Sequence, residues 1–244
     1  MNLTDPSLAI TPTLDGPALM VLAQAGQPLT VAEVARRSAR GSEIGIRRAI
    51  ARLVEQGVVT SITVGRTTAY RLNEAHIAAS VVMNMSRLRT ELWRRLALEM
   101  GSWRVHPQYA CVFGSAARHD GDEASDIDIL LVRTPTEPEA RDHSRRAKSQ
   151  RAYRDMVEGV STTTFATWMS RGSLTRWSGY VDHLRELVPL WTGNAAQVVE
   201  MNTLEWSRER RAKTEFSNNV TSDAIRIYEN LGLSTFRYDK DVPQ

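Results

Sequence analysis

A chain of 244 residues is long enough for one or two domains with modest hydrophobic cores, so a single small module is excluded. Hydrophobic residues make up 42% of the chain and charged residues 24%, which excludes wholesale disorder and fibrous repeats. No apolar run reaches the ~20 residues of a membrane helix, and the first basic residue is Arg36, which argues against a secretory signal. The one cysteine, Cys111, cannot form an internal disulfide, so we expect a cytoplasmic protein that does not bind membranes.

The charge balance and the first residues carry little functional information. The 31 basic and 28 acidic side chains leave a net charge of +3, which permits binding to a polyanion without requiring it. Residues Met1–Leu14 contain two prolines and several hydroxyl residues with no hydrophobic periodicity, so we expect a mobile leader without a function. Local arrangements further along the chain must therefore decide the function.

Three helices and a hairpin are predicted between residues 15 and 73. Apolar residues recur at helical spacing from Asp15 onward, and Thr30 with Glu33 forms a capping box that opens a second helix. A third amphipathic helix follows, and then two β-branched runs on either side of a glycine-containing turn. The second helix, third helix and two strands are predicted over Val31–Ser38, Ser42–Gln56, Val58–Val64 and Ala69–Leu72. This order is typical of a winged helix-turn-helix.

The third predicted helix has a polar face that suits nucleic acid. If its apolar residues pack inward, its arginines point outward, where they can pair with guanine edges or phosphates in the major groove. A basic residue at the hairpin tip can reach a neighbouring groove. We therefore predict binding to double-stranded DNA; the alternatives are an ordinary solvated face and a module that docks onto protein. The predicted DNA-binding residues are Ser42, Arg47, Arg48, Arg52 and Arg66.

The stretch from Ile46 to Asn73 resembles the recognition helix and wing of bacterial winged-helix regulators, and the likeness covers about Asp15–Asn73. This resemblance implies a role in transcription regulation. A long helical stretch is predicted from Glu74 to about Met100, because Leu88, Leu92, Leu96 and Met100 share one stripe. We interpret residues 74–104 as a helical linker to a second domain.

The most specific motif is CVFGSAARHDGDEASDIDILLV, from Cys111 to Val132. A strand that ends in Gly114 and Ser115 can present backbone N–H groups and a hydroxyl to phosphates. Asp126 and Asp128 alternate on a second predicted strand, Asp126–Arg133, so both carboxylates face one side and can hold divalent cations. The aliphatic residues between and after them face a core. Together these features predict phosphoryl chemistry.

At these residues the chain resembles the minimal nucleotidyltransferases of the DNA polymerase beta superfamily, closely over Tyr109–Val132 and more loosely to Gly193. The resemblance implies a small mixed sheet, a nucleoside triphosphate bound with Mg²⁺ or Mn²⁺, and transfer of a nucleotidyl group to a protein or RNA acceptor. The implied catalytic and metal-binding residues are Asp126 and Asp128. The implied nucleotide-binding residues are Gly114, Ser115, Arg118 and Ser125.

One departure from that family affects catalysis. Active members carry a third carboxylate on a later strand, but the expected strand, Val160–Trp168, contains neither Asp nor Glu. Glu158 and Asp155 precede it in sequence of helical composition, Arg141–Glu158. Loss of one ligand weakens metal binding and removes a group that helps to deprotonate the acceptor.

Three functions therefore stay open: a DNA-binding nucleotidyltransferase, a transcriptional regulator whose degenerate domain senses nucleotide, and a toxin–antitoxin component. The fold class is predicted as α+β, with a winged helix-turn-helix at 15–73 and a nucleotidyltransferase-like α/β domain at 105–195. A helix is predicted over Trp177–Leu190, and another, basic one over Ala195–Lys213 in a helical extension at 196–244 of unknown function. Assembly into a homodimer is left open.

Overall fold

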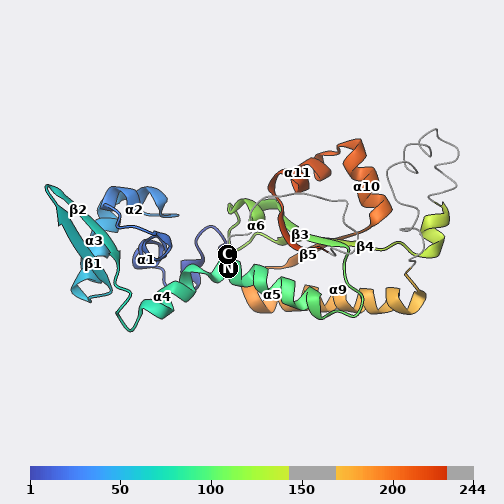
Figure 1. The fold of residues 1–244 in the computed structure, drawn as a ribbon, viewed down its shortest axis with the longest axis horizontal. Coiled ribbons are helices and arrows are strands. Elements are labelled where there is room, and N and C mark those ends of the chain that lie inside the picture. The colour runs from blue at the N-terminus through green and yellow to red at the C-terminus, as the bar shows by residue number, and fades with distance from the viewer. Residues whose placement is uncertain (143–168, 230–244) are drawn as a thin grey trace. The chain divides into compact units, whose positions relative to one another are not determined.

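The computed structural model describes residues 1–142 and 169–229, and these residues form two compact units. The first unit comprises Met1–Trp93 together with His119–Ser125, and the second comprises Arg94–Arg118 and the described residues from Asp126 onward. Helices and strands occur in both units, so the predicted α+β class is confirmed (Figure 1). Within the described ranges, no helix combines the length and apolar character needed to cross a bilayer.

The first unit contains the predicted three helices and hairpin. Helices α1 (Asp15–Gln24), α2 (Val31–Arg37) and α3 (Glu43–Glu55) precede strands β1 (Val59–Val64) and β2 (Thr67–Leu72). The predicted capping box opens α2, where the Thr30 hydroxyl accepts from the Glu33 amide and the Glu33 carboxylate accepts from the Thr30 amide. Gly65, with φ +61°, makes the two-residue turn between the strands.

The core of the first unit lies between the three helices and the hairpin. Residues from α1, α2, α3 and β1 bury their apolar faces together, including Ala18, Val34, Ile46 and Ile50. Burial of each valine, isoleucine or leucine side chain in this core stabilises the unit by about 1.5–3 kcal/mol. Leu29 adds a bridge to the hairpin, since its amide and carbonyl both bond to Tyr70.

The helical stretch predicted from Glu74 to Met100 begins later than expected and is interrupted once. The structure has two helices, α4 (Ala79–Ser86) and α5 (Leu88–Ser102), with Arg87 as the C-cap of the first. Helix α4 packs against α1, and Ala79 and Val82 are buried with Leu72. This packing makes α4 part of the first unit. The stripe predicted on α5 is confirmed, because Leu92, Leu96 and Met100 are all buried.

The mobile leader predicted for Met1–Leu14 is also wrong. Pro6–Ala9 forms a 3-10 helix, η1, and Leu3 is 1% exposed, Asp5 4% and Ser7 0%. Sequence periodicity missed this segment because its buried residues are few and include two polar side chains that bond to other parts of the unit. The segment is therefore an ordered component of the first unit.

The second unit is built on a four-stranded sheet with the order β5-β4-β3-β6. Strand β3 (Tyr109–Phe113) pairs antiparallel with β4 (Ile127–Arg133) and with β6 (Ile225–Glu229), and β5 (Ala196–Asn202) pairs parallel with β4. The predicted strands at β3 and β4 are confirmed. The helix predicted over Ala195–Lys213 is wrong in its first part, where β5 lies, and right in α10 (Thr203–Ala212).

Helices cover the two faces of this sheet (Figure 1). On one face, Trp206 of α10 and Val220 of α11 (Glu215–Asp223) pack on Cys111, Leu130 and Val132. Toward the other face, Trp177 of α9 (Arg171–Thr192) donates its indole N–H to Glu200 on β5 at 2.8 Å. The helix predicted over Trp177–Leu190 is thus confirmed and longer than expected. The helix predicted over Arg141–Glu158 runs largely beyond residue 142, outside the described residues.

Candidate nucleotide site and DNA-binding face

Gly114 makes a turn that a larger residue would block. It opens the short helix α6 (Gly114–Arg118) directly after β3, with φ +69°. A Cβ added at Gly114 would overlap Oδ2 of Asp128 and lie 3.2 Å from its Cγ. Both the left-handed backbone and this close approach require glycine. The Asp128 carboxylate therefore lies directly against the turn that the motif assigns to phosphate binding.

Asp128 is brought to this turn by the pairing of two strands. Its Cα partner on β3 is Phe113, the residue before Gly114. Asp126 lies just before β4 and is exposed, while Ile127 and Ile129 are fully buried. The predicted alternation between a carboxylate side and an apolar side is confirmed at these positions.

The carboxylate of Asp128 is partly desolvated and lies within the field of a second negative charge. Burial raises the pKa of Asp128, the charge of Asp126 raises it further, and the charge of Arg118 lowers it. Two neighbouring carboxylates repel one another, and a divalent cation bound by both relieves that repulsion. Mg²⁺ prefers carboxylate oxygens, so the donor set fits this ion. No group of three His, Cys, Asp or Glu residues suited to a metal occurs within residues 1–142 and 169–229.

The other predicted nucleotide-binding residues have different surroundings. Ser115 is half-buried in α6 next to Gly114. Arg118 is at the end of α6, with Nη1 3.8 Å from Oδ2 of Asp223 on α11. The Ser125 hydroxyl donates to Oδ1 of Asp122 at 2.7 Å and accepts from the Asp122 amide at 3.0 Å. Ser125 thus stabilises its own loop, and this hydrogen bond lowers the pKa of Asp122.

Gln197, which the sequence analysis did not single out, lies beside Asp128 in the sheet. Strand β5 is the parallel neighbour of β4, and Gln197 is the Cα partner of Asp128. Paired residues on adjacent strands project from the same face of a sheet. The resemblance expected a third carboxylate on a later strand, and this described later strand carries an amide beside Asp128. Val198 and Val199, two adjacent β-branched residues, are the local signal for a strand that the helical prediction overlooked.

The strand expected over Val160–Trp168, together with Glu158 and Asp155, lies outside the described residues.

The predicted DNA-binding residues lie on α3, at its N-cap and at the tip of the hairpin, and they differ in their hydrogen-bond and ion-pair partners. The Ser42 hydroxyl accepts from the Gly45 amide and caps α3. Arg52 bonds both carboxylate oxygens of Asp15 on α1, at 2.9 and 3.0 Å, which fixes α3 against α1. Arg47 forms an exposed ion pair with Glu43 one turn earlier, at 2.8 Å.

Besides these residues, two further arginines and one aliphatic residue are exposed on this surface. Arg48 and Arg66 are exposed, and neither forms an ion pair with any side chain in the described part of the protein. Ile44, in the first turn of α3, is 65% exposed. An exposed aliphatic side chain one turn before an arginine can contact the methyl group of thymine in the major groove.

Comparisons with known proteins identify no family. No protein-family model matches the chain, and no curated protein matches it. Among solved structures, the chain has a similarity to human N-acetylserotonin methyltransferase in complex with SAM. The identity is 25%, the match covers 35% of this chain and 27% of that chain, and the TM-score is 0.23. A likeness at that score carries no argument about fold or function.

Proposed function

We propose that this chain is a DNA-binding protein whose second unit binds a nucleoside triphosphate together with Mg²⁺. The observation that carries the proposal is the Asp128 carboxylate against the Gly114 turn, where burial and then the charge of Asp126 raise its pKa. A glycine turn can bind phosphates through its backbone N–H groups, and two nearby carboxylates can bind the Mg²⁺ that accompanies a triphosphate. The order of helices and strands in the first unit supports a winged helix-turn-helix as the DNA-binding part.

Each residue of the nucleotide site has a separate role in this proposal. Asp126 and Asp128 would hold Mg²⁺, and the Gly114 and Ser115 amides and hydroxyl would contact the triphosphate. Arg118 would add positive charge near the phosphates, in competition with its pairing to Asp223. When bound, the metal would neutralise phosphate charge and lower the pKa of an acceptor hydroxyl.

We infer nucleotide binding with slow transfer. In-line transfer needs a group that accepts the proton of the acceptor hydroxyl. The β5 position beside Asp128 is Gln197, whose amide is neutral and cannot act as that base. We therefore propose that the second unit senses a nucleotide rather than catalysing its rapid transfer.

The test of binding against transfer uses each of the four labelled nucleoside triphosphates, with Mg²⁺ or Mn²⁺ and a whole-cell lysate. We expect retention of label on this chain under native conditions and little covalent labelling of any protein or RNA. Rapid covalent labelling that is absent from an Asp126→Asn control would contradict the inference of slow transfer while supporting the site itself.

The DNA-binding part is tested on α3. Replacement of Arg47 and Arg48 together by Ala removes two exposed charges, and we expect weaker retardation of genomic fragments and a shallower dependence on salt. The Glu43–Arg47 pair is exposed and worth little, so DNA phosphates can compete for Arg47. Unchanged retardation by the double variant would identify α3 as a protein-docking surface.

A further inference from the structure

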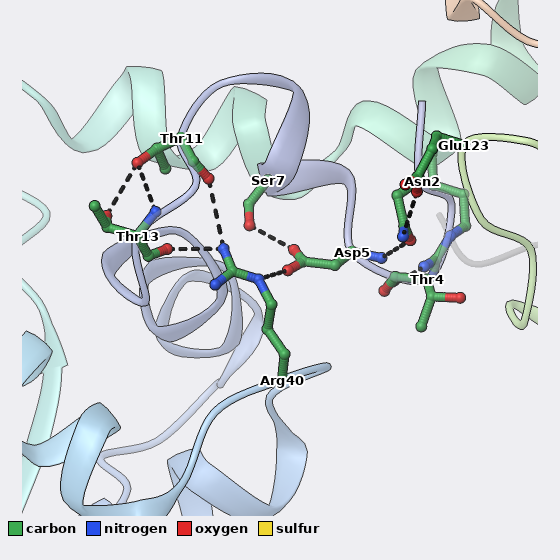
Figure 2. A network of polar contacts seen from close by, with 9 residues as sticks. Asn2, Thr4, Asp5, Ser7, Thr11, Thr13, Arg40 and Glu123 are labelled. Atoms are coloured by element: carbon green, nitrogen blue, oxygen red, sulfur yellow. Dashed lines mark hydrogen bonds and ion pairs between the residues drawn. The ribbon is translucent and has the colours of Figure 1, made fainter.

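The first residues of the chain are bonded to the loop between the two halves of the nucleotide motif. The Thr4 amide donates to the Gly121 carbonyl at 3.1 Å, and the Thr4 hydroxyl contacts the carbonyls of His119 and Gly121, each at 3.0 Å. Asn2 donates to the Glu123 carboxylate at 3.3 Å, as Figure 2 shows. The loop His119–Ser125 is the chain between Arg118 and Asp126, so its path constrains both halves of that motif.

The loop begins with a residue in a strained conformation. His119 has φ +65°, a left-handed value that costs a non-glycine residue about 1–3 kcal/mol, and its carbonyl is one of those that Thr4 contacts. The Arg89 guanidinium bonds the Leu3 carbonyl through Nε and Nη2, the former at 3.0 Å. Leu3 itself is buried. These contacts fix the first residues of the chain and join them to the loop.

The same segment is bonded at its other end to the turn that precedes α3. Asp5 accepts from Nε of Arg40 at 2.6 Å and from the Ser7 hydroxyl, and it is almost fully buried (Figure 2). Arg40 also donates to the Thr13 carbonyl at 2.8 Å. Arg40 immediately precedes Gly41, with φ +104°, so these bonds define the path of the chain into α3.

Side-chain packing reinforces this connection. A Cβ added at Gly41 or at Gly45 would meet the Leu14 side chain, at 2.8 Å in the first case. A Cβ at Gly16 would meet the buried Ser7 hydroxyl at 2.6 Å. Gly41 in the α2–α3 turn and Gly45 in the first turn of α3 thus accommodate the end of this segment. We term the segment, residues Asn2–Leu14, the N-terminal strap.

We propose that the N-terminal strap couples the nucleotide site to DNA binding, so that nucleotide occupancy changes the affinity of α3 for DNA. The inference rests on the proposed function. Binding of a triphosphate and Mg²⁺ between Gly114 and Asp128 must fix the path of the intervening loop. A change in the loop alters the position of the strap through the hydrogen bonds of Thr4 and Asn2. The strap in turn alters the α2–α3 turn through the contacts of Asp5 and Leu14.

Thermodynamic linkage makes the proposal quantitative. If nucleotide changes the dissociation constant for DNA by a given factor, DNA changes the dissociation constant for nucleotide by the same factor. Coupling between two sites is commonly about fivefold or more. The two affinities can be measured independently, so a mismatch between the two factors would expose an artefact in either titration.

The experiment uses the full chain, a duplex selected from a randomised pool for binding, and MgATP, MgGTP, MgCTP or MgUTP. We expect at least one triphosphate to change the DNA affinity of the wild type by about fivefold or more. Thr4→Val keeps the side-chain shape and removes the hydroxyl that contacts the loop, and we expect this variant to bring the factor to within about twofold of one. Each ligand should still bind the variant on its own.

The matched control is Ile10→Ser, which alters an exposed strap residue whose side chain bonds neither the loop nor Arg40. It should keep the wild-type coupling factor. Asp5→Asn is the second variant, which weakens the strap at its α3 end and should also reduce the factor. Binding of both ligands to the wild type without coupling, or full coupling in Thr4→Val, would overturn the inference and leave the proposed function intact. Failure of either ligand to bind the wild type would overturn both.

Discussion

The exposed face of α3 and the turn at Gly114 are two candidate sites built in different ways. The α3 arginines project from one helix into solvent, and each position follows from the helical period. The Gly114 turn is assembled from two strands, and its half-buried carboxylate fits only because glycine leaves room for it. Each substitution among exposed charges should weaken DNA binding by a part, because the remaining charges still act. A single substitution in the closely packed Gly114 turn should abolish nucleotide binding. We therefore expect substitutions at the Gly114 turn to have larger effects than substitutions on the α3 face.

Gly114→Ala should have the largest effect. The added methyl group requires a strained backbone and displaces Asp128, so we expect loss of Mg²⁺-dependent nucleotide binding and destabilisation by more than about 1 kcal/mol. Gly179→Ala is the control, because Gly179 lies within α9 with no atom near its missing Cβ. That variant should gain about 0.5–1 kcal/mol. Chemical denaturation and calorimetry check both, and a Gly114→Ala protein with wild-type nucleotide affinity would refute the role of the turn.

Asp128→Asn should separate stability from binding. Since the pKa of Asp128 is raised, the folded protein binds this proton more tightly than the unfolded chain, and stability falls as pH rises from 3.8 through the raised value. At pH 7 the variant should therefore raise the melting temperature of the metal-free protein and lose stabilisation by Mg²⁺. The gain should vanish below the ordinary aspartate pKa of 3.8.

Asp122→Asn should shift the melting temperature at pH 7 in the opposite direction to Asp128→Asn. The pKa of Asp122 is lowered by its hydrogen bond from Ser125, so ionised Asp122 stabilises the fold above pH 3.8. The variant should lower the melting temperature at pH 7, and this loss should shrink as pH falls through the lowered pKa. Thermal melts from pH 3 to pH 7 measure both variants, and shifts of the same sign would show that the two carboxylates do not differ as described.

Effects on the α3 face should be smaller and graded. Arg48→Ala and Arg66→Ala should each weaken DNA binding by about tenfold at low salt and reduce the salt slope by about one. Arg52→Ala should instead lower thermal stability, because Asp15 loses the Nη2 group that bonds both of its carboxylate oxygens. Fluorescence anisotropy and thermal melts distinguish the two groups. Equal losses of DNA affinity at Arg48 and Arg52 would show that the Asp15 pairing does not withhold Arg52 from DNA.

Gln197→Asp should strengthen binding, in contrast to the substitutions above. A third carboxylate beside Asp128 adds one negative ligand, so Mg²⁺ affinity should rise by about tenfold, and labelling of an acceptor should become detectable. Gln197→Asn is the control without charge and should behave as the wild type. Equal Mg²⁺ affinity in the two variants would show that this β5 position does not face the metal.

Local patterns in the sequence predicted much of the fold. Capping residues and helical periodicity placed α2 and α3 within a residue or two, because both signals act over one or two turns. Strands β3 and β4 were predicted from their apolar runs and from the alternation of Asp126 and Asp128 with aliphatic residues.

The elements that sequence reasoning missed depend on contacts between distant residues. Strand β5 is stabilised by parallel pairing with β4, about seventy residues earlier, and its composition also suits a helix. The N-terminal strap is ordered by Arg40, Arg89 and Gly121, which no periodicity in Met1–Leu14 could reveal. The difference between Arg52, which is paired, and Arg48 likewise depends on Asp15, a residue on a different helix.

Isothermal titration calorimetry of the wild type and of Asp126→Asn, with each nucleoside triphosphate in the presence and absence of Mg²⁺, tests the central claim most directly. We expect Mg²⁺-dependent binding of at least one triphosphate to the wild type. Asp126→Asn, which preserves shape and removes one charge, should fold normally and lose that binding. Equal affinity of the two proteins for nucleotide, with and without Mg²⁺, would contradict a metal–nucleotide site at Asp126 and Asp128.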